Sequence, residues 1–455
     1  MQVLGVNGIS RAPYHQRPLV AAPRLGFAYD PWGDGKTAIR GGWGMFYNRI
    51  DGNSYYGMSG QSPVVYTQTV SNLSFAQIAA EDTGAPPSLS SLSVAPTAPA
   101  AWPANVPWDV VMNASAGVQR TLGSSTMIDV GYTWSYGHNL KTTYNANWIP
   151  IGAGWPFTAS NLNPTTAGNT SADIGSIFER TKYPGYGAIT ENALVGHSNY
   201  NALTAILQQR LSHGVVFGLS YTFSKAMGTT TYNQAVPDNE AWNYGRASTD
   251  RRHNLQINYY YDLPNVAKKY GIRVLGAVTD HWTFSGITSI QSGAPFNPSC
   301  GLTSGAATVS GGYTGTPDVT MRCQVIGNPL ANIPAGTFFN PAAYAMPALA
   351  TGPDNSIVGP PAIGNQGGGS GALTYPHVTN FDLTMTKNIP LGTERRLLRF
   401  QVQAYNAFNH PQFNAMNTGI QFNPATNAVS NPAAIGLPTG TLPARVVAFS
   451  ARFQF

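Results

Sequence analysis

The last twelve residues of the chain, 444 to 455, alternate between apolar and polar side chains. One set of alternate positions holds Phe455, Phe453, Ala451, Phe449 and Val447, and the other holds Gln454, Arg452, Ser450 and Ala448. Successive side chains of a β-strand point to opposite faces, so this pattern predicts a strand with one apolar and one wet face. The apolar face would meet a core in a soluble sheet and lipid in an outer-membrane barrel.

The same alternation recurs along the chain, mostly in pairs of segments joined by tight turns. Its cleanest run lies between Val215 and Lys225, after the turn Ser212-His213-Gly214. We expect eleven strands, at 23–29, 36–47, 111–120, 126–135, 200–211, 215–225, 254–261, 281–291, 380–388, 397–408 and 444–455.

The links between these strands alternate between short and long. The long links are 48–110, 136–199, 226–253, 292–379 and 409–443. Outer-membrane barrels have short periplasmic turns and long outer loops, whereas a β-sandwich follows no such rule. The pattern therefore predicts an antiparallel transmembrane β-barrel segment with a periplasmic C-terminus. The short link from Tyr261 to His281 fits least well.

Complete bacterial barrels have an even strand number, so an odd count of eleven predicts missing strands upstream. Eleven is half of 22, the strand number of the plugged outer-membrane transporters. The N-terminus lacks the charged start and apolar core of a secretory signal. Either the membrane interpretation is wrong or the chain is the later part of a longer protein. We divide it into an irregular piece, 1–22, and a partial barrel domain, 23–455, which ends in the strand 444–455.

Composition favours the membrane interpretation. Charged residues make up 10% of the chain, against about 25% in ordinary soluble domains. The sequence has no run of about 18 apolar residues, so any membrane crossing would use strands. The net charge of +6 is small for 455 residues, and Lys268-Lys269 is the only lysine pair. We therefore expect no nucleic-acid partner.

Several segments carry a family resemblance. They are PRLGFAYDPWGDGKTAIRGGWGMFYNR (23–49), SNYNALTAILQQRLSHGVVFGLSYTFSKAM (198–227), STDRRHNLQINYYYDLP (248–264) and AYNAFNHPQF (404–413). As a set they resemble the C-terminal barrel half of Oar-like TonB-dependent receptors. The final strand, with Val447, Phe449, Phe453 and Phe455, resembles the terminal signal that the barrel-assembly machinery reads.

The resemblance implies energy-coupled uptake of a small solute across the bacterial outer membrane. The solute could be a carbohydrate, a peptide or a metal chelate. TonB would act through a plug, and that plug is absent from this chain. An alternative of another class is a non-transporting surface, adhesion or structural barrel. A third is a soluble all-β carbohydrate-binding protein or hydrolase, which needs a buried apolar core and, for hydrolysis, paired acids.

Candidate chemistry is sparse. Cys300 and Cys323 lie in one predicted outer loop, where an oxidising compartment permits a disulfide. Two free thiols are the alternative. No neighbouring His or third Cys supplies zinc-ligand spacing. The chain has none of the common hydrolase, metalloprotease or nucleotide-binding motifs, so we expect no enzyme activity, cofactor or metal.

Other polar clusters have ordinary explanations. We interpret His253, which follows Asp250-Arg251-Arg252, as part of a hydrogen-bonded rim. Asp30 and Asp34 suggest a tight turn more than a cation loop. The segment Asp238-Asn239-Glu240 is a weak cation candidate.

The aromatic residues divide into two groups. Trp43 and Trp134 fall near the outer ends of strands, where such rings favour the membrane interface. The predicted outer loops hold Trp102, Trp108, Trp148, Trp155, Trp242 and Tyr244. Of these, Trp155, Trp242 and Tyr244 are weak ligand-contact candidates, and we favour packing among the loops instead. The loop 292–379, with Gly367 to Ser370, suggests a mobile lid or a poorly ordered segment.

Overall fold

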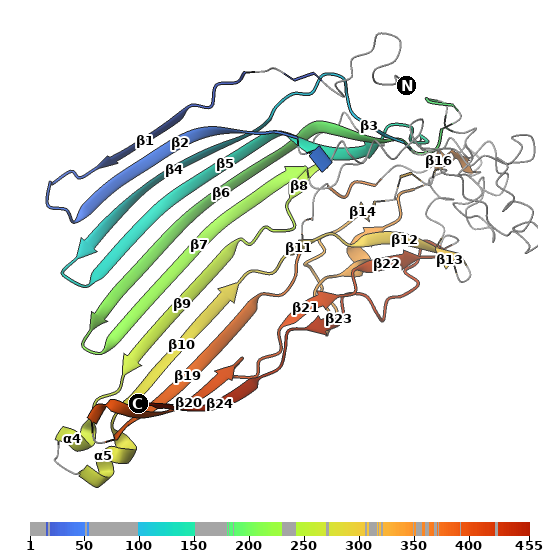
Figure 1. The fold of residues 1–455 in the computed structure, drawn as a ribbon. Coiled ribbons are helices and arrows are strands. Elements are labelled where there is room, and N and C mark those ends of the chain that lie inside the picture. Colours follow the sequence, from blue (N-terminus) through green and yellow to red (C-terminus); the bar gives the residue numbers. More distant parts are fainter. Residues whose placement is uncertain are drawn as a thin grey trace, which may run out of the picture.

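The structure, a computed structural model, is built around one large sheet of long antiparallel strands (Figure 1). The strands are β1 (Arg24–Tyr29), β2 (Thr37–Asn48), β4 (Asp109–Leu122), β5 (Thr126–Asn145), β6 (Thr190–Ser212), β7 (Val215–Thr229), β9 (His253–Asp262), β10 (Trp282–Gln291), β19 (Val378–Leu391), β20 (Thr393–Tyr405) and β24 (Val446–Gln454). Each pairs with the next in this order. The eleven predicted strands and the antiparallel fold class are confirmed.

The structure describes residues 15–16, 19–50, 52–53, 99–150, 180, 182–184, 186–229, 243–269, 273–304, 307–308, 316, 318–319, 322–348, 350–351, 357–359, 364–367, 371, 373–391, 393–423 and 426–455. Most of the predicted N-terminal piece, together with Trp155, Trp242 and the segment Asp238-Asn239-Glu240, lies outside these residues.

Some strand ends differ from the prediction. β5 and β6 continue ten residues further towards the long links, beyond an irregularity at Gly137 and Leu140. Their extensions alternate poorly, so the periodicity did not reveal them. β20 ends at Tyr405 instead of Phe408, because Asn406 adopts a left-handed conformation with φ of 47°.

The short turns follow from local sequence. His213 and Gly214 both have positive φ, 53° and 77°, which matches the two-residue hairpin turn that suits twisted strands. Asp30 caps the β1–β2 turn, because its carboxylate accepts the amide hydrogens of Trp32, Gly33 and Gly35. These three bonds, led by the one from Gly35, lower the pKa of Asp30.

The two faces of the sheet differ in polarity. Pairing register places the following residues on one side, called the apolar face: Leu25, Phe27, Ile39, Val118, Val130, Tyr132, Leu203, Leu219, Phe223, Leu255, Ile257, Phe284, Leu383, Met385, Phe400, Val402, Phe449 and Phe453. Many of these side chains stay exposed, including Phe27 at 61% and Phe449 at 78%. A soluble sheet would bury such a face, so the exposed surface suits lipid.

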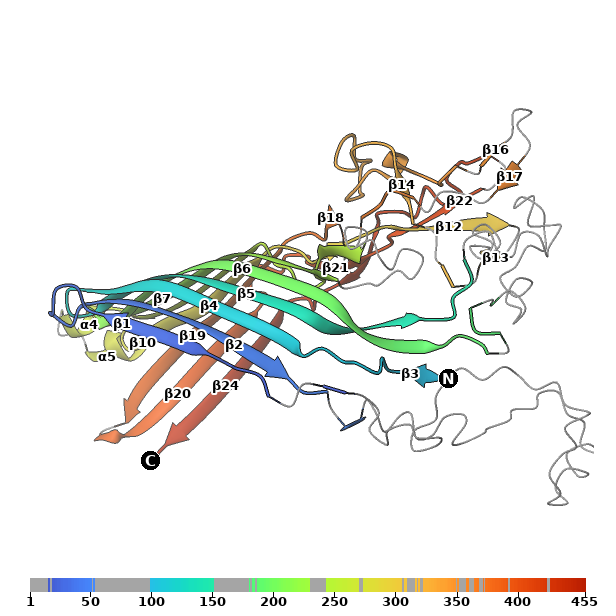
Figure 2. The same cartoon turned by 90° about the horizontal axis from the view of Figure 1, so that it is seen from above.

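The opposite side, called the polar face, is lined by Asn113, Ser115, Gln119, Asp129, Thr133, Thr204, Ser220, Thr222, Gln256, Asn258, Ser285, Ser289, Asp382, Thr384, Gln401, Gln403, Ser450 and Arg452. The sheet is curved and open in the described part of the chain (Figure 2). Its edges are β1 and β24, each paired with one neighbour on the main path.

The two ends of the sheet also differ (Figure 1). The turn end carries the short hairpins, the C-terminus, and the helices α4 (Val266–Lys269) and α5 (Arg273–Thr279). These helices lie in the link that fitted the barrel pattern least well. None of the helices in the described ranges is long and apolar enough to cross a membrane.

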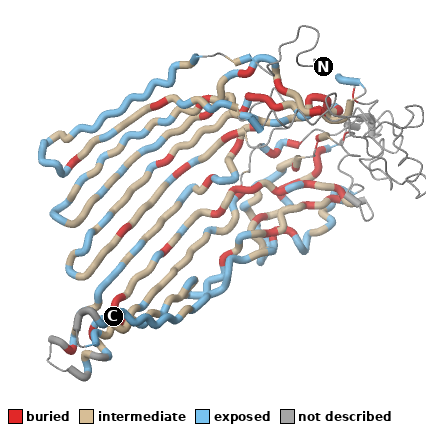
Figure 3. The backbone as a smooth tube through the Cα atoms, viewed as in Figure 1, coloured by how far each residue is buried: buried red, intermediate tan, exposed pale blue. Residues whose placement is uncertain are grey.

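The loop end carries the long links and short secondary elements. These are β3 (Ala100–Ala101), β8 (Tyr244–Arg246), β11 (Pro295–Phe296), β12 (Ser299–Ser304), β13 (Ala307–Thr308), β14 (Gln324–Val325), η4 (Pro341–Ala343), β15 (Tyr344–Ala345), β16 (Ala350–Thr351), β17 (Ile357–Gly359), β18 (Leu373–Thr374), β21 (Phe413–Met416), β22 (Gly419–Phe422) and β23 (Pro438–Thr441). Buried residues gather at this end, whereas the long strands are mostly half-buried or exposed (Figure 3).

Candidate functional site

The polar face forms a hydrogen-bonded wall. Arg40 on β2 and Asp129 on β5 form an ion pair across β4. Ser289 donates to Gln256 at 2.5 Å on the neighbouring strand, and the hydroxyls of Thr204 and Thr222 are 3.3 Å apart. Such a wall suits the water-filled or plug-filled interior of a barrel.

A shallow hollow of about 290 Å³ lies near the β1 edge. It is lined by Arg24, Gly42, Trp43, Gly44, Phe46, Asn113, Ala114, Ser115 and Thr133. A side chain at Gly44 would come within 3.0 Å of the Phe46 ring, and the Arg24 guanidinium lies 4.7 Å from the centre of that ring. The hollow offers one fixed cation beside an aromatic ring.

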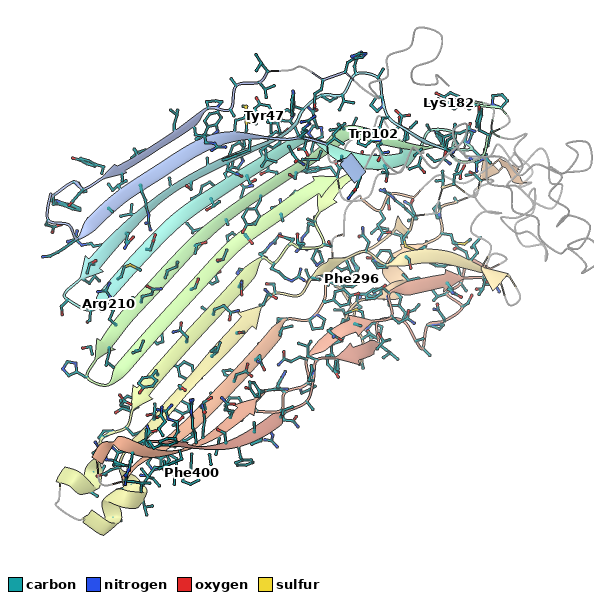
Figure 4. The ribbon with its side chains drawn as sticks, viewed as in Figure 1. Tyr47, Trp102, Lys182, Arg210, Phe296 and Phe400 are labelled. Atoms are coloured by element: carbon teal, nitrogen blue, oxygen red, sulfur yellow. A yellow bond between two sulfur atoms is a disulfide. The ribbon has the colours of Figure 1, made fainter. Side chains whose placement is uncertain are left out.

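Two long links fold together into a compact unit at the loop end, called the cap, which comprises the described residues of 292–377 and 406–445. β12 of the first link pairs in parallel with β22 of the second, so that Cys300 lies opposite Ile420. The cap core consists of Phe296, Cys300, Leu302, Cys323, Phe339, Ala343, Tyr344, Met346, Leu373, Met416, Ile420, Phe422 and Ile435. Figure 4 marks Phe296 in this region. These residues share a packed core, whereas Gly368, Gly369 and Ser370 of the predicted lid lie outside the described residues.

A disulfide joins Cys300 and Cys323 inside the cap core, with their Cα atoms 5.2 Å apart. Both residues are buried. Buried Gln366 bridges the same region, because its side-chain oxygen accepts the Cys323 amide at 3.3 Å and its nitrogen donates to the Pro298 carbonyl at 3.1 Å. The two cysteines therefore form part of the packed core of the cap.

Burial also changes the ionisation of cap residues. It raises the pKa of Tyr344 to about 12, so the phenol is neutral at physiological pH. Burial lowers the pKa of Arg322, whose guanidinium donates to the Gln366 carbonyl at 3.3 Å.

A buried ion pair, called the latch, connects the first of the two cap links to the link between β5 and β6. Arg180 is 8% exposed, and its two terminal nitrogens lie 2.7 and 3.3 Å from the carboxylate oxygens of Asp318. Asp318 also accepts the Ile149 amide at 2.8 Å, and Thr316 donates to the Ile149 carbonyl at 2.7 Å. This bidentate geometry is typical of strong arginine–carboxylate pairs. It holds the link between β5 and β6 against the link between β10 and β19.

Buried Asn147 organises the same region. Its amide nitrogen donates to the carbonyls of Tyr183, Tyr186 and Gly187, and its oxygen accepts the Tyr183 amide. Neither Asn147 nor the latch was predicted from the sequence. Their partners lie far away along the chain, and no motif marks them.

The described loop aromatics mostly pack within the loops. Trp102 packs with Val106 and Leu194, and the Lys141 ammonium lies 5.3 Å from its ring. Trp108 meets Tyr47 edge to face at 6.0 Å. Figure 4 marks Tyr47, Trp102 and Lys182 at the loop end and Arg210 near the turn end. Tyr244 lies on β8, paired with Thr229 of β7. Trp155 and Trp242 lie outside the described residues.

The rim cluster around His253 is structural. Asp250 is 1% exposed, and it accepts the Ala226 amide and the Arg246 guanidinium, both at 2.8 Å. The His253 ring lies 2.8 Å from the Tyr221 hydroxyl. Within the part of the chain that the structure describes, no group of three His, Cys, Asp or Glu residues could hold a metal ion.

The terminal strand β24 forms an edge of the sheet. Val447, Phe449 and Phe453 lie on the apolar face, opposite Ala404, Val402 and Leu398 of β20. Phe455 follows the strand and is 95% exposed, with its ring 5.8 Å from that of Phe453. The strand thus presents a row of apolar side chains along an open edge.

Sequence comparison agrees with this architecture. The family model described as "Outer membrane beta barrel domain" matches residues 1–448. The chain belongs to this family. As a member of an outer-membrane barrel family it is a protein of the bacterial outer membrane, and its apolar face is the surface that meets lipid. No curated protein matches the chain in sequence.

Solved structures that resemble this outer-membrane barrel segment include three from bacteria. The ferripyoverdine receptor of the Pseudomonas aeruginosa outer membrane has 10% identity and a TM-score of 0.40, covering 95% of this chain and 33% of that protein. The outer membrane transporter YddB from Escherichia coli has 8% identity and a TM-score of 0.45, covering 94% and 39%. The FrpB iron transporter from Neisseria meningitidis has 9% identity and a TM-score of 0.40, covering 94% and 38%. The chain therefore spans 33–39% of the length of these three proteins.

Proposed function

We propose that this barrel segment belongs to a TonB-dependent receptor that takes up a small solute across the outer membrane. The observation that carries the proposal is the eleven-stranded sheet, with one continuous apolar face and one hydrogen-bonded polar face. It occurs in a chain whose motifs resemble the Oar-like receptors. Eleven is half of 22, so a second set of strands would close the barrel, with the polar face around a plug.

The loop end faces the cell exterior in this proposal, and the turn end and the C-terminus face the periplasm. A solute would first meet the cap and the latch region, because these lie at the outer mouth. The solute class stays open among carbohydrates, peptides and metal chelates. The described residues favour no single class. We propose that the protein is not an enzyme.

The mass of the native protein tests this proposal. An antibody against the C-terminal strands would detect it in the outer-membrane fraction of the source cells. We expect a band at or above about twice the 48.4 kDa of this chain, and we expect TonB to co-purify after cross-linking. A 48.4 kDa band without TonB would favour a surface or structural barrel that does not transport.

A further inference from the structure

The link between β9 and β10 is fastened to the apolar face at the turn end. Trp282 and Lys387 are cross-strand partners on β10 and β19, in line with Phe284 and Met385 of that face. The Trp282 indole donates to the Val278 carbonyl at 2.7 Å. Lys387 donates to the same carbonyl at 3.3 Å and to the Asp280 carbonyl. The carboxyl end of α5 is therefore held on the side of the sheet that meets lipid.

These contacts compensate the positive charge of Lys387 on the apolar face. Lys387 is 6% exposed and lies among apolar positions, where an unpaired ammonium group would be very unfavourable. The carbonyl groups at the end of α5 satisfy the ammonium, and the Trp282 ring centre lies 5.5 Å from it. The link thus covers the Lys387 ammonium group at the turn end of the apolar face.

Three aliphatic side chains on the described part of this link are exposed. Leu275 is 47% exposed and Val278 is 67% exposed, and three-residue spacing places them on one side of α5. Val266 on α4 is 51% exposed. Of these three side chains, Val278 belongs to the residue whose carbonyl is bound by Trp282 and Lys387 on the apolar face.

The charge of the link complements an anionic membrane surface. Residues 263–281 contain Lys268, Lys269 and Arg273 but only one acid, Asp280. Asp280 is buried and accepts the Ala267 amide at 2.9 Å. A basic segment with exposed aliphatic side chains has the chemistry of an interfacial membrane anchor.

We propose that the α4–α5 link is a membrane anchor that inserts Leu275 and Val278 into the periplasmic leaflet, beside anionic phospholipid headgroups. The anchor would fix the depth of β9 and β10 in the bilayer. This inference rests on the membrane orientation of the sheet. It is independent of which solute, if any, the protein transports.

Spin labels test the anchor directly. Leu275→Cys and Val278→Cys would each carry a nitroxide in the full protein, reconstituted in vesicles of phosphatidylethanolamine and phosphatidylglycerol. The native cysteines are joined in a buried disulfide, so they do not take up label. His213→Cys in the β6–β7 turn is the water control, and Phe400→Cys on the apolar face is the lipid control. We expect the nitroxides at 275 and 278 to be more accessible to oxygen than to a water-soluble nickel chelate, as the nitroxide at 400 should be. If the nitroxides at 275 and 278 are as accessible to the nickel chelate as the nitroxide at 213, the anchor proposal is wrong.

A second measurement needs no label. Trypsin cuts after Lys268, Lys269 and Arg273, so an anchored link should resist cleavage in vesicles and become sensitive in the double variant Leu275→Glu/Val278→Glu. Equal cleavage of the two proteins would contradict insertion. Vesicles of phosphatidylcholine alone test the charge component. In those vesicles we expect the labels at 275 and 278 to lie less deep in the bilayer. An unchanged depth would show that the anchor does not need anionic lipid.

Discussion

Single buried polar residues at the loop end join segments that are distant in the sequence. Arg180 and Asp318 are 138 residues apart, yet they form the bidentate latch. Asn147 alone binds backbone groups of three residues in the same link through four hydrogen bonds. Buried charges and amides of this kind persist only when they are paired, so each residue specifies one arrangement of the loops.

Replacing one latch residue should loosen this region. We expect Asp318→Asn to leave the Arg180 charge uncompensated and to cost about 3–5 kcal/mol locally. Hydrogen exchange should show faster exchange of the Ile149 amide, which Asp318 binds. Asp34→Asn in the exposed β1–β2 turn is the matched control, expected within about 0.5 kcal/mol of the parent. Unchanged protection of Ile149 would mean that the latch contributes nothing.

Tyr344 should make the cap sensitive to alkali. Its folded pKa is raised from 10.0 to about 12, so folding favours the neutral phenol. The resulting stabilisation is complete below pH 10 and is lost as the pH rises from 10 to 12. Its size is about 2–3 kcal/mol.

The matched variants for this effect are Tyr344→Phe and, as the control, Tyr183→Phe at an exposed tyrosine. We expect Tyr344→Phe to abolish the specific loss of cap stability between pH 10 and 12, and Tyr183→Phe to retain it. Near-ultraviolet circular dichroism during unfolding would follow the difference. Identical alkaline profiles for all three proteins would disprove the role of Tyr344.

At the scale of elements, strands and links follow different rules. Each long strand pairs with the next one along the chain, so local alternation and short turns define the sheet. The cap instead uses parallel pairing between β12 and β22, which come from separate links. Its stability depends on a small core and one covalent bond.

The Cys300–Cys323 disulfide should be important for this small core. By loop entropy, a bond between cysteines 23 residues apart stabilises by about 3 kcal/mol. We expect the Cys300→Ala/Cys323→Ala variant to lose cap protection in hydrogen exchange while the long strands keep theirs. The folded parent should resist reductant, because both cysteines are buried. Rapid reduction without denaturant would show that the cap opens readily.

The terminal strand should control assembly. If the assembly machinery reads the apolar residues of β24, Phe455→Ser should strongly reduce the amount of protein in the outer membrane, whereas the neighbouring Gln454→Ser should not. Phe455 is 95% exposed and contributes little packing, so a fall would report recognition more than stability. Quantitative immunoblotting of outer-membrane fractions would check this, and equal amounts of both variants would argue against the signal.

At the scale of the whole molecule, the open sheet is the dominant property. Among the described residues, β1 and β24 each have one unpaired edge, and the apolar face crosses all the long strands. Strand edges and large apolar surfaces both promote association. A closed barrel would remove the edges, and a bilayer would cover the face.

We therefore predict that the 455-residue chain, expressed by itself, oligomerises or aggregates in solution. Light scattering coupled to size-exclusion chromatography would measure the mass. A monodisperse monomer without detergent would refute the prediction. Refolding with detergent should reduce aggregation by covering the apolar face, but the edges should still pair between copies.

The alternation of apolar and polar residues was sufficient to predict the eleven strands, their order and the two faces of the sheet. Alternation is a local property, and a strand such as Val215–Thr229 reveals its apolar side without knowledge of its neighbours. The cysteine pair was also visible, because two cysteines in one loop leave few partners. The extensions of β5 and β6 towards the long links were not visible in the sequence, since their residues do not alternate between apolar and polar.

The cap, the latch and the packing of α5 against Trp282 and Lys387 could not be predicted from the sequence and emerge from the three-dimensional fold. The pairing of β12 with β22 places Cys300 opposite Ile420 across more than a hundred residues. Lys387 donates to the carbonyls of Val278 in α5 and of Asp280 directly after it. These contacts depend on which links the sheet brings to the same end. Long links have no periodicity, so their packing follows from burial and pairing in three dimensions.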